Sequence, residues 1–243
     1  MNVWAISDIG LVRQQNQDAF RVEKLPSGQI LLVVCDGMGG ARAGNVASNV
    51  AANVFADTVL AHLADTEYQD TVSAVMMDAV KQANRAVWEQ ANADANCFGM
   101  GTTLVAALVT EQACCIANVG DSRAYLINAD GIRKVTRDHS VVEDLVLCGE
   151  ITPEQARTHP QKNLITRALG TMEETKADIY EEPCLAGSFL LLCSDGLSNV
   201  VADQEILYEV IHGGEPENCC NRLLNTALQR GAPDNVTAVL LQM

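Results

Sequence analysis

The sequence predicts an α+β fold in which antiparallel sheets are sandwiched between pairs of helices. Three observations lead to this fold class. Strand-like segments occur in runs without strict βαβ alternation, and helical segments occur in pairs between those runs. The 243 residues also contain no repeat, low-complexity tract or Pro/Gly-rich linker, so we expect one continuous domain over residues 1–243.

The N-terminal part is predicted to contain two strands followed by two long helices. Residues 3–8 and 29–35 are predicted strands, and the second is a β-branched apolar run that ends at a loop over residues 36–40. Two long helices are predicted over residues 44–64, rich in Ala, Val and Leu, and 71–95, where apolar residues repeat at helical spacing.

The rest of the chain is predicted to alternate short strands with shorter helices. Turn residues at 128–131 predict a hairpin. The polar stretch 139–158 is predicted to be helical, and Thr152, Pro153 and Gln155 form a helix-start pattern within it. The other expected elements are strands over 102–109, 113–119, 124–128, 175–180, 188–193 and 236–241, and helices over 203–211 and 216–230.

Composition excludes several classes of function. The net charge is −15 without a basic run, whereas nucleic-acid binding needs a positive surface. We find no signal peptide, and no apolar run approaches the ~18 residues of a membrane span. The nine cysteines show no C-x-x-C spacing and lie mostly in apolar segments, so we interpret them as reduced core thiols. We therefore expect a soluble cytoplasmic protein.

Four aspartates beside apolar runs are the most informative chemical pattern. Asp36 and Asp195 follow apolar runs, Asp121 follows IANVG, and Asp234 precedes NVTAVLL. Each alone is most simply a turn residue, particularly where glycine is adjacent. Four carboxylates that converge in space would need a cation to offset their repulsion. A set of hard oxygen ligands without His or Cys favours Mg²⁺ or Mn²⁺ over zinc.

Eight motifs follow one another over essentially the whole chain. They are SDIGLVRQQNQDAF (7–20), VVCDGMGG (33–40), GMGTTLVAALV (99–109), IANVGDSRAYLI (116–127), TRDHS (136–140), NLITRALG (163–170), LLLCSDGLSNVV (190–201) and GAPDNVTAVLL (231–241). In this order they resemble the metal-dependent Ser/Thr protein phosphatases, the type 2C class in its bacterial form. The resemblance implies a four-layer α-β-β-α sandwich of two antiparallel sheets flanked by helix pairs, with a flap over residues 141–163.

The resemblance also implies a role for each site residue. Asp36 resembles the carboxylate that bridges two metals, and the carbonyl of Gly37 resembles a ligand of one of them. The remaining implied roles are Asp195 and Asp234 as ligands of the other metal, Asp121 as a ligand of a third, weaker metal with Asp195 shared, Arg13 as the phosphate-binding arginine, and Asp18 as the acidic residue that holds metal-bound water.

These roles imply hydrolysis of phosphoserine and phosphothreonine by a metal-activated bridging hydroxide. Two Mn²⁺ or Mg²⁺ ions ~3.5–4 Å apart would lower the pKa of a bridging water, and the planar fork of Arg13 would stabilise the phosphoryl oxygens. No protein nucleophile is required. A Cys-based phosphatase would show C-x5-R, and no cysteine here has Arg six positions later.

Several positions depart from the family pattern. Gln17 stands where many members have Glu, which we expect to weaken support for the second metal. Ala41 and Asn45 replace a common His and Glu, and we expect altered loop packing or metal affinity there. Met38 stands where animal members carry a proposed general-acid His. Another group or water must then protonate the leaving oxygen. His139 and His159 are candidates by residue type alone, and for His139 a capping or packing role is favoured.

Two rival functions remain to be weighed against the phosphatase. A catalytically weak, phosphopeptide-binding relative would usually lack one of Asp36, Asp195 or Asp234, and all three are present. A metal-dependent hydrolase of nucleotides or small phosphate esters would favour a Gly-rich phosphate loop, and no G-x-x-x-x-G-K-[ST] occurs. The expected partners are phosphorylated proteins and a cognate Ser/Thr kinase, and the expected state is a monomer without nucleic-acid or membrane binding.

Overall fold

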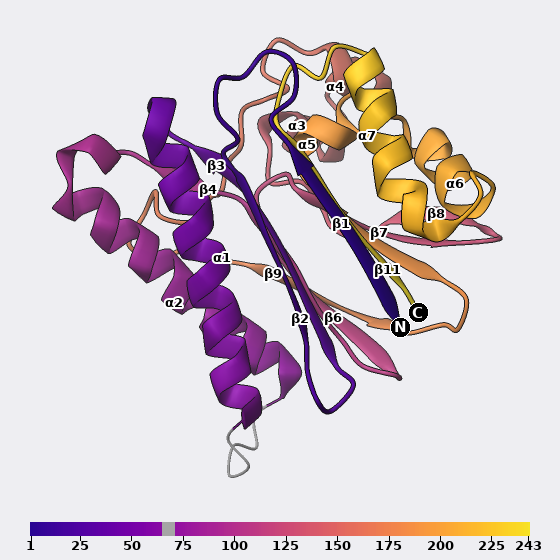
Figure 1. Cartoon of the computed structure of the whole chain (residues 1–243). Coiled ribbons are helices and arrows are strands. Elements are labelled where there is room, and N and C mark those ends of the chain that lie inside the picture. Colours follow the sequence, from indigo (N-terminus) through magenta and orange to yellow (C-terminus); the bar gives the residue numbers. More distant parts are fainter. Residues whose placement is uncertain (65–70) are drawn as a thin grey trace.

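The computed structural model describes residues 1–64 and 71–243, apart from the side chains of residues 41 and 42. Two sheets lie face to face between two groups of helices (Figure 1). The strands are β1 (Asn2–Asp8), β2 (Asp18–Lys24), β3 (Ile30–Met38), β4 (Gly101–Thr102), β5 (Leu104–Val109), β6 (Ala113–Val119), β7 (Arg123–Asn128), β8 (Gly131–Lys134), β9 (Asp178–Pro183), β10 (Phe189–Cys193) and β11 (Val236–Gln242). The α-helices are α1 (Gly40–Ala64), α2 (Val72–Ala93), α3 (Val141–Leu147), α4 (Pro153–Thr158), α5 (Asp195–Ser198), α6 (Asp203–Ile211) and α7 (Cys219–Gln229).

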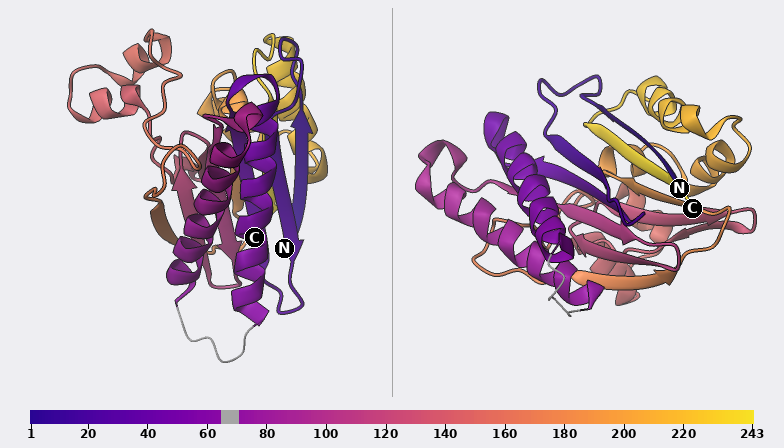
Figure 2. Two further views of the ribbon diagram at one scale, coloured as in Figure 1. Left: turned by 90° about the vertical axis from the view of Figure 1, so that its left-hand side faces the viewer. Right: turned by 60° about the horizontal axis from the view of Figure 1, so that its bottom comes forward.

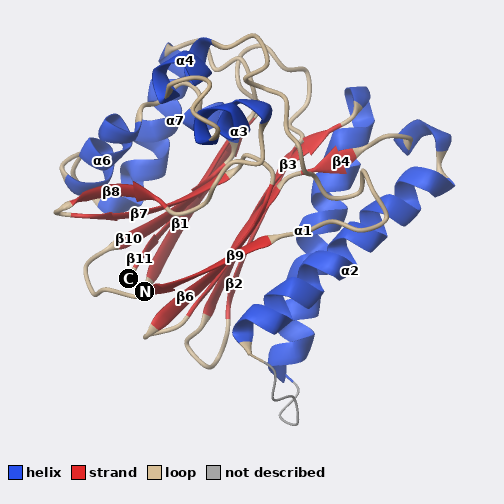
Figure 3. Ribbon diagram, turned by 180° about the vertical axis from the view of Figure 1, so that it is seen from behind, coloured by secondary structure: helices blue, strands red, loops and turns tan. Residues whose placement is uncertain are grey.

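Every strand pairing in the two sheets is antiparallel. One sheet has the order β1-β11-β10-β7-β8, and the other has the order β2-β3-β5-β6-β9, with β4 added beside β3. Strands β1 and β11, from the two ends of the chain, pair from Asn2↔Gln242 to Asp8↔Val236. Figure 3, seen from behind, shows α1 and α2 on the outer face of one sheet, and α6 and α7 beyond the other.

Three apolar clusters fill the spaces between these four layers. Buried residues of α1 and α2, such as Phe55 and Met76, pack on the sheet that contains β3. A second cluster joins α6 and α7 to the sheet that contains β11. The third lies between the sheets and includes Leu32, Ile116 and Leu192. The long apolar runs in β3 and β10 are explained by burial on both faces.

The predicted fold class is confirmed, and the differences are local. The loop expected over residues 36–40 was wrong, because β3 continues through Asp36 to Met38 and pairs with β4. Strand β2 was not predicted, since polar residues interrupt its apolar pattern. The segment 139–158 forms two short helices, and Thr152 and Gln155 make the expected capping box at the start of α4.

Two further observations concern composition. All nine cysteines are free thiols, and seven of them are buried. Among the described helices, none combines the length and the apolar character needed to cross a membrane.

Candidate metal centre and active site

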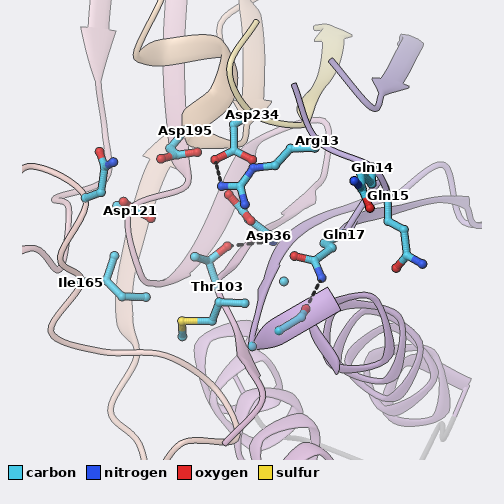
Figure 4. A pocket seen from close by; sticks show the side chains of 15 residues that line it. Arg13, Gln14, Gln15, Gln17, Asp36, Thr103, Asp121, Ile165, Asp195 and Asp234 are labelled. Atoms are coloured by element: carbon cyan, nitrogen blue, oxygen red, sulfur yellow. Dashed lines mark hydrogen bonds and ion pairs between the residues drawn. The ribbon is translucent and has the colours of Figure 1, made fainter. Parts of the chain in front are cut away.

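A cavity of about 530 Å³ opens where the ends of the two sheets meet the loops. Its walls come from sequence-distant segments, and Figure 4 shows several carboxylates and one guanidinium pointing into it. Both sheets contribute side chains, so this site depends on the whole sandwich. The lining residues are Arg13, Gln14, Gln15, Gln17, Asp36, Gly37, Met38, Gly39, Gly40, Thr103, Asp121, Asn163, Ile165, Asp195 and Asp234.

Asp36 is held from both sides of its backbone. Its amide N–H donates to Thr103 Oγ1 over 2.9 Å, and its carbonyl accepts from the Thr103 amide over 2.8 Å and from the Thr102 hydroxyl over 2.9 Å. The preceding strand residues are fully buried. The carboxylate therefore projects from an anchored position into the cavity.

Asp195 and Asp234 come from the opposite sheet. Asp195 begins α5, with Ser194 between it and β10, and Asn199 Nδ2 donates to its Oδ2 over 2.9 Å. Its Oδ1 is buried without a hydrogen-bond partner. Asp234 precedes β11, and its Oδ1 accepts from the amide of Asn235 over 2.9 Å. The structure thus places both aspartates in the lining of the same cavity as Asp36.

Glycines bring the backbone of the cavity floor close to neighbouring chain. A Cβ at Gly37 would lie 2.0 Å from the carbonyl oxygen of Gly44, and one at Gly196 would lie 1.9 Å from that of Asn235. No side chain fits at either position. Gly37 therefore lines the cavity with backbone alone, next to Asp36.

Asp121 lies in the turn between β6 and β7 and reaches the same cavity. The turn is tied to Asp36 through two hydroxyls, because Ser122 Oγ and Thr103 Oγ1 lie 2.6 Å apart and Thr103 also accepts from the Asp36 amide. Thr103 had no assigned role in the sequence. Its neighbourhood in GMGTTL carried no signal of this contact.

Asp18 lies behind Asp36 rather than in the cavity lining. The two residues are opposite each other in the β2–β3 pairing, and Asp18 is buried. Its Oδ2 accepts from the Ser194 hydroxyl over 2.7 Å, while its Oδ1 has no partner. An unpartnered buried carboxylate oxygen is costly, so this atom needs a water or ion that protein groups do not supply.

Burial and mutual repulsion disfavour the charged form of these carboxylates. Burial, with the charges of Asp18 and Asp195, raises the pKa of Asp36 well above its usual range. Burial also raises the pKa of Asp195, and the Asp234 charge adds to this. The pKa values of Asp18 and Asp121 rise to about 7, mainly through burial. A nearby cation would reverse these shifts.

The carboxylates line the cavity without forming a closed cage. Within residues 1–64 and 71–243, no three His, Cys, Asp or Glu side chains already converge into a metal-binding group. The donors are all oxygens, which suits Mg²⁺ and Mn²⁺, and Mg²⁺ usually keeps several waters besides a few carboxylates. The unpartnered Oδ1 atoms of Asp18 and Asp195 fit the same ions.

Arg13 points into the cavity but pairs with Asp234. Its Nη2 donates to Asp234 Oδ2 over 2.6 Å, and the Arg13 side chain is 52% exposed (Figure 4). This bond, more than the charges of Asp36 and Asp195, raises the pKa of Arg13. Sequence reasoning gave the two residues separate roles and missed their direct contact, since 221 positions separate them.

Three positions that depart from the family pattern have different surroundings. Gln17 Nε2 donates to the carbonyl of Gly40 over 2.8 Å, a bond that the carboxylate of Glu could not make. Asn45 is exposed on α1, where its Oδ1 accepts from Asn49. Met38 lines the cavity. The side chain of Ala41 lies outside the described part of the chain.

Neither candidate histidine lines the cavity. His139 is 4% exposed and bonded to the turn that carries Asp121, as described below. Its neighbour Ser140, rather than His139, caps α3. His159 is the C-cap residue of α4, and its Nδ1 accepts from the amide of Gln161.

Known proteins match this chain over nearly its full length. The family model described as Protein phosphatase 2C matches residues 12–229. This chain belongs to the protein phosphatase 2C family. The match covers every candidate site residue except Asp234, which lies five residues beyond it.

Curated relatives of this phosphatase 2C chain come from several bacteria. It is 35% identical to the serine/threonine phosphatase stp of Listeria innocua over 237 residues, which is 97% of this chain and 93% of the relative. It is 42% identical to the serine/threonine protein phosphatase PstP of Mycobacterium tuberculosis over 236 residues, but these cover only 44% of that longer protein.

Solved structures of bacterial phosphatases confirm the fold. Serine/threonine phosphatase Stp1 from Staphylococcus aureus superimposes with a TM-score of 0.91 at 39% identity, covering 100% of this chain and 95% of that one. The catalytic domain of PstP in complex with 2 manganese ions gives a TM-score of 0.84 at 38% identity, covering 98% and 96%. The resemblance read from the eight motifs is therefore confirmed.

Proposed function

We propose that this chain is a metal-dependent protein phosphatase that hydrolyses phosphoserine and phosphothreonine in proteins. The observation that carries the proposal is one cavity in which Asp36, Asp121, Asp195 and Asp234 meet a single guanidinium, that of Arg13. Family membership and the names of the relatives support the same activity. The manganese ions of the related PstP catalytic domain support the same cofactor class.

We propose that two divalent cations, Mn²⁺ or Mg²⁺, occupy the cavity. Asp36 would bridge both, the Gly37 carbonyl would ligate one, and Asp195 and Asp234 would ligate the other. Asp121 would ligate a third, weaker ion together with Asp195. When bound, such ions act as Lewis acids and lower the pKa of coordinated water, which supplies a nucleophile near neutral pH.

The chain's own residues would then bind and orient the substrate. Arg13 is the one arginine or lysine that lines the cavity in the described residues, and half of its side chain is accessible. We propose that its remaining donors bind the phosphoryl oxygens in a planar fork while Asp234 holds the guanidinium in place. The free Oδ1 of Asp18 would accept a hydrogen bond from water beneath Asp36.

The leaving oxygen must receive a proton, and the cavity supplies no histidine for this. Met38 stands in the lining, and no described lining residue is His, Lys, Cys or Tyr. We therefore propose that solvent water protonates the departing serine or threonine oxygen. This requirement is weaker for an ester with a low-pKa leaving group such as p-nitrophenol, which should depart without help.

The partners follow from the same chemistry. Phosphorylated proteins are the proposed substrates, and a Ser/Thr kinase that makes them is the proposed opposing enzyme. We further propose that residues 1–243 act as one catalytic domain, since β1 and β11 pair in one sheet, and that this domain works as a monomer. The nine free thiols suit a reducing compartment such as the cytoplasm, where we place the protein.

Turnover of a phosphothreonine peptide with and without a chelator tests the proposal. Metal-stripped protein should be inactive, and Mn²⁺ should restore turnover. Matched phosphotyrosine peptide should be a poorer substrate. Undiminished turnover in excess EDTA would contradict the mechanism, and Mn²⁺ binding without hydrolysis of any phosphopeptide would favour the phosphopeptide-binding relative instead.

A further inference from the structure

His139 joins three segments beside the cavity through its backbone. Its amide donates to the carbonyl of Gly120 over 2.9 Å, and its carbonyl accepts from the amide of Thr166 over 2.8 Å. Ser140 and Ile165 form the bridge that closes the base of the flap, and Ile165 lines the cavity. The residue therefore sits between the Asp121 turn and the root of the flap.

The imidazole makes a further hydrogen bond to the same turn, and this bond determines which ring nitrogen carries the proton. Nδ1 accepts from the amide N–H of Gly120 over 3.0 Å. An atom that accepts from an N–H carries no proton, so the ring proton of the neutral imidazole lies on Nε2. Nε2 faces Asp178 Oδ2 at 3.2 Å, at the start of β9. One side chain thus spans from the Asp121 turn to the edge of the sheet.

Arg167 reinforces the neutral form of the ring. Its Nη1 donates to Asp178 Oδ1 over 2.9 Å and lies 3.1 Å from His139 Nε2, so both donors converge on one carboxylate. Burial lowers the pKa of His139, and the Arg167 charge acts in the same direction against the hydrogen bond to Asp178. Protonation would also replace the Nδ1 acceptor with a second donor facing the Gly120 N–H.

The backbone of the turn that His139 contacts has little conformational freedom. Gly120 has a φ of +105°, and a Cβ there would lie 2.6 Å from the Thr103 side chain. The next residue is Asp121, and Ser122 then bonds to Thr103. Asp121 is therefore fixed on one side through Gly120 by His139 and on the other side through Ser122.

We propose that His139, in its Nε2–H tautomer, is a positioning residue. By accepting the Gly120 amide hydrogen, it sets the Asp121 carboxylate for the third, weaker cation, which we call the outer ion; the two cations bridged by Asp36 are the inner ions. This inference rests on the proposed function, in which Asp121 is a metal ligand. It assigns His139 no proton transfer to substrate, because its Nε2 faces Asp178 and the ring does not line the cavity.

Two substitutions separate the acceptor from the rest of the imidazole. In His139→Asn the amide oxygen takes the place of Nδ1 and keeps an acceptor for Gly120, while the contact with Asp178 is lost. In His139→Gln the amide reaches the place of Nε2 and keeps the contact with Asp178, while the acceptor is lost. Both remove the ring from a buried position, so a packing defect alone affects them alike.

Calorimetric titration of metal-stripped protein with Mn²⁺ measures the effect without using activity. Asp121→Ala serves as the reference that lacks the outer ion, and His159→Gln in α4 serves as the control. His139→Gln should weaken the outer Mn²⁺ about tenfold or more, because a buried N–H is left without an acceptor. His139→Asn should stay within about threefold of wild type, since the acceptor is kept. The inner ions should change little in either variant.

Equal weakening of the outer ion in both His139 variants would overturn the inference, as would no weakening in either. Absence of Mn²⁺ binding by the wild type would instead overturn the proposed function. A second measurement needs no variant and so does not depend on folding of the substituted chains. Nitrogen-15 chemical shifts of wild-type His139 should show a bare Nδ1 and a protonated Nε2, and a protonated Nδ1 would overturn the inference.

Discussion

The cavity floor, formed by Asp36, Asp121, Asp195 and Asp234, differs from the flap in how deeply its surroundings are buried. Asp36 belongs to β3 and Asp195 begins α5 after β10, and the strand residues that precede both are buried. The flap over residues 141–163 contains α3 and α4, neither of which has a buried residue. It projects from the sandwich in the left view of Figure 2. We propose from this difference that the chemistry belongs to the cavity floor and that substrate choice belongs to the flap.

Removal of the Asp36 carboxylate, the proposed metal bridge, should cause the largest loss of activity. Asp36→Ala should reduce kcat for p-nitrophenyl phosphate and phosphothreonine peptide by about 100-fold or more, because metal ions supply several kcal/mol of transition-state stabilisation. Stopped assays in saturating Mn²⁺ measure the loss. Cys148→Ser changes an exposed thiol on the flap side of the molecule and should keep wild-type turnover of p-nitrophenyl phosphate. Near-normal turnover of Asp36→Ala would refute the assignment.

Substitution of Arg13 should have the next largest effect, and it should weaken substrate binding more than metal binding. Arg13→Ala should lower kcat/KM by about 10–100-fold, since hydrogen bonds to charged groups contribute about 1.5–3 kcal/mol. Arg13→Lys keeps the charge but loses the planar fork, so it should recover only part of this loss. Steady-state kinetics at several Mn²⁺ concentrations test this. A defect that excess Mn²⁺ cures would mean that Arg13 acts on the metals instead.

The charged floor should make stability depend on pH when metals are removed. The pKa values of Asp18 and Asp121 rise to about 7 in the folded state, above the usual value near 4. Between these two pKa values the folded state binds more protons than the unfolded state. The contribution of these groups to the free energy of unfolding is therefore highest below about pH 4 and decreases as the pH rises through about 7.

Thermal melts of the metal-stripped protein measure this dependence. The Tm should fall between about pH 5 and about pH 8, and Mn²⁺ should raise it most at the higher pH. A chain of this size loses roughly 2–4 °C for each kcal/mol. Asp121→Asn removes one of the carboxyl groups whose pKa lies at about 7 and should flatten the fall. An unchanged slope in this variant would show that other groups cause it.

Changes to the flap should have the smallest effect on the floor. The amide of Val141 donates to the carbonyl of Leu164 over 2.9 Å, so a two-residue turn can replace residues 142–162. The shortened protein should stay folded and should hydrolyse p-nitrophenyl phosphate within about threefold of wild type, because no buried flap residue is lost. Its preference among phosphothreonine peptides should decrease. Loss of the small-ester activity would contradict the separation of the two regions.

The sequence predicted the floor better than the details that position it. Asp36, Asp121, Asp195 and Asp234 lie beside apolar runs that only one buried register can satisfy, so their convergence could be anticipated. The contact between Arg13 and Asp234 could not, because it depends on how two loops fold over the cavity. The continuation of β3 to Met38 was missed because its partner β4 has only two residues.

Direct titration of metal-stripped protein with Mn²⁺, combined with turnover of a phosphothreonine peptide in the same samples, tests the central claim. The account predicts no turnover without Mn²⁺, recovery of turnover as two ions bind per chain, and loss of both binding and turnover in Asp36→Ala. Turnover that is complete in excess EDTA, or that rises without metal binding, would contradict it.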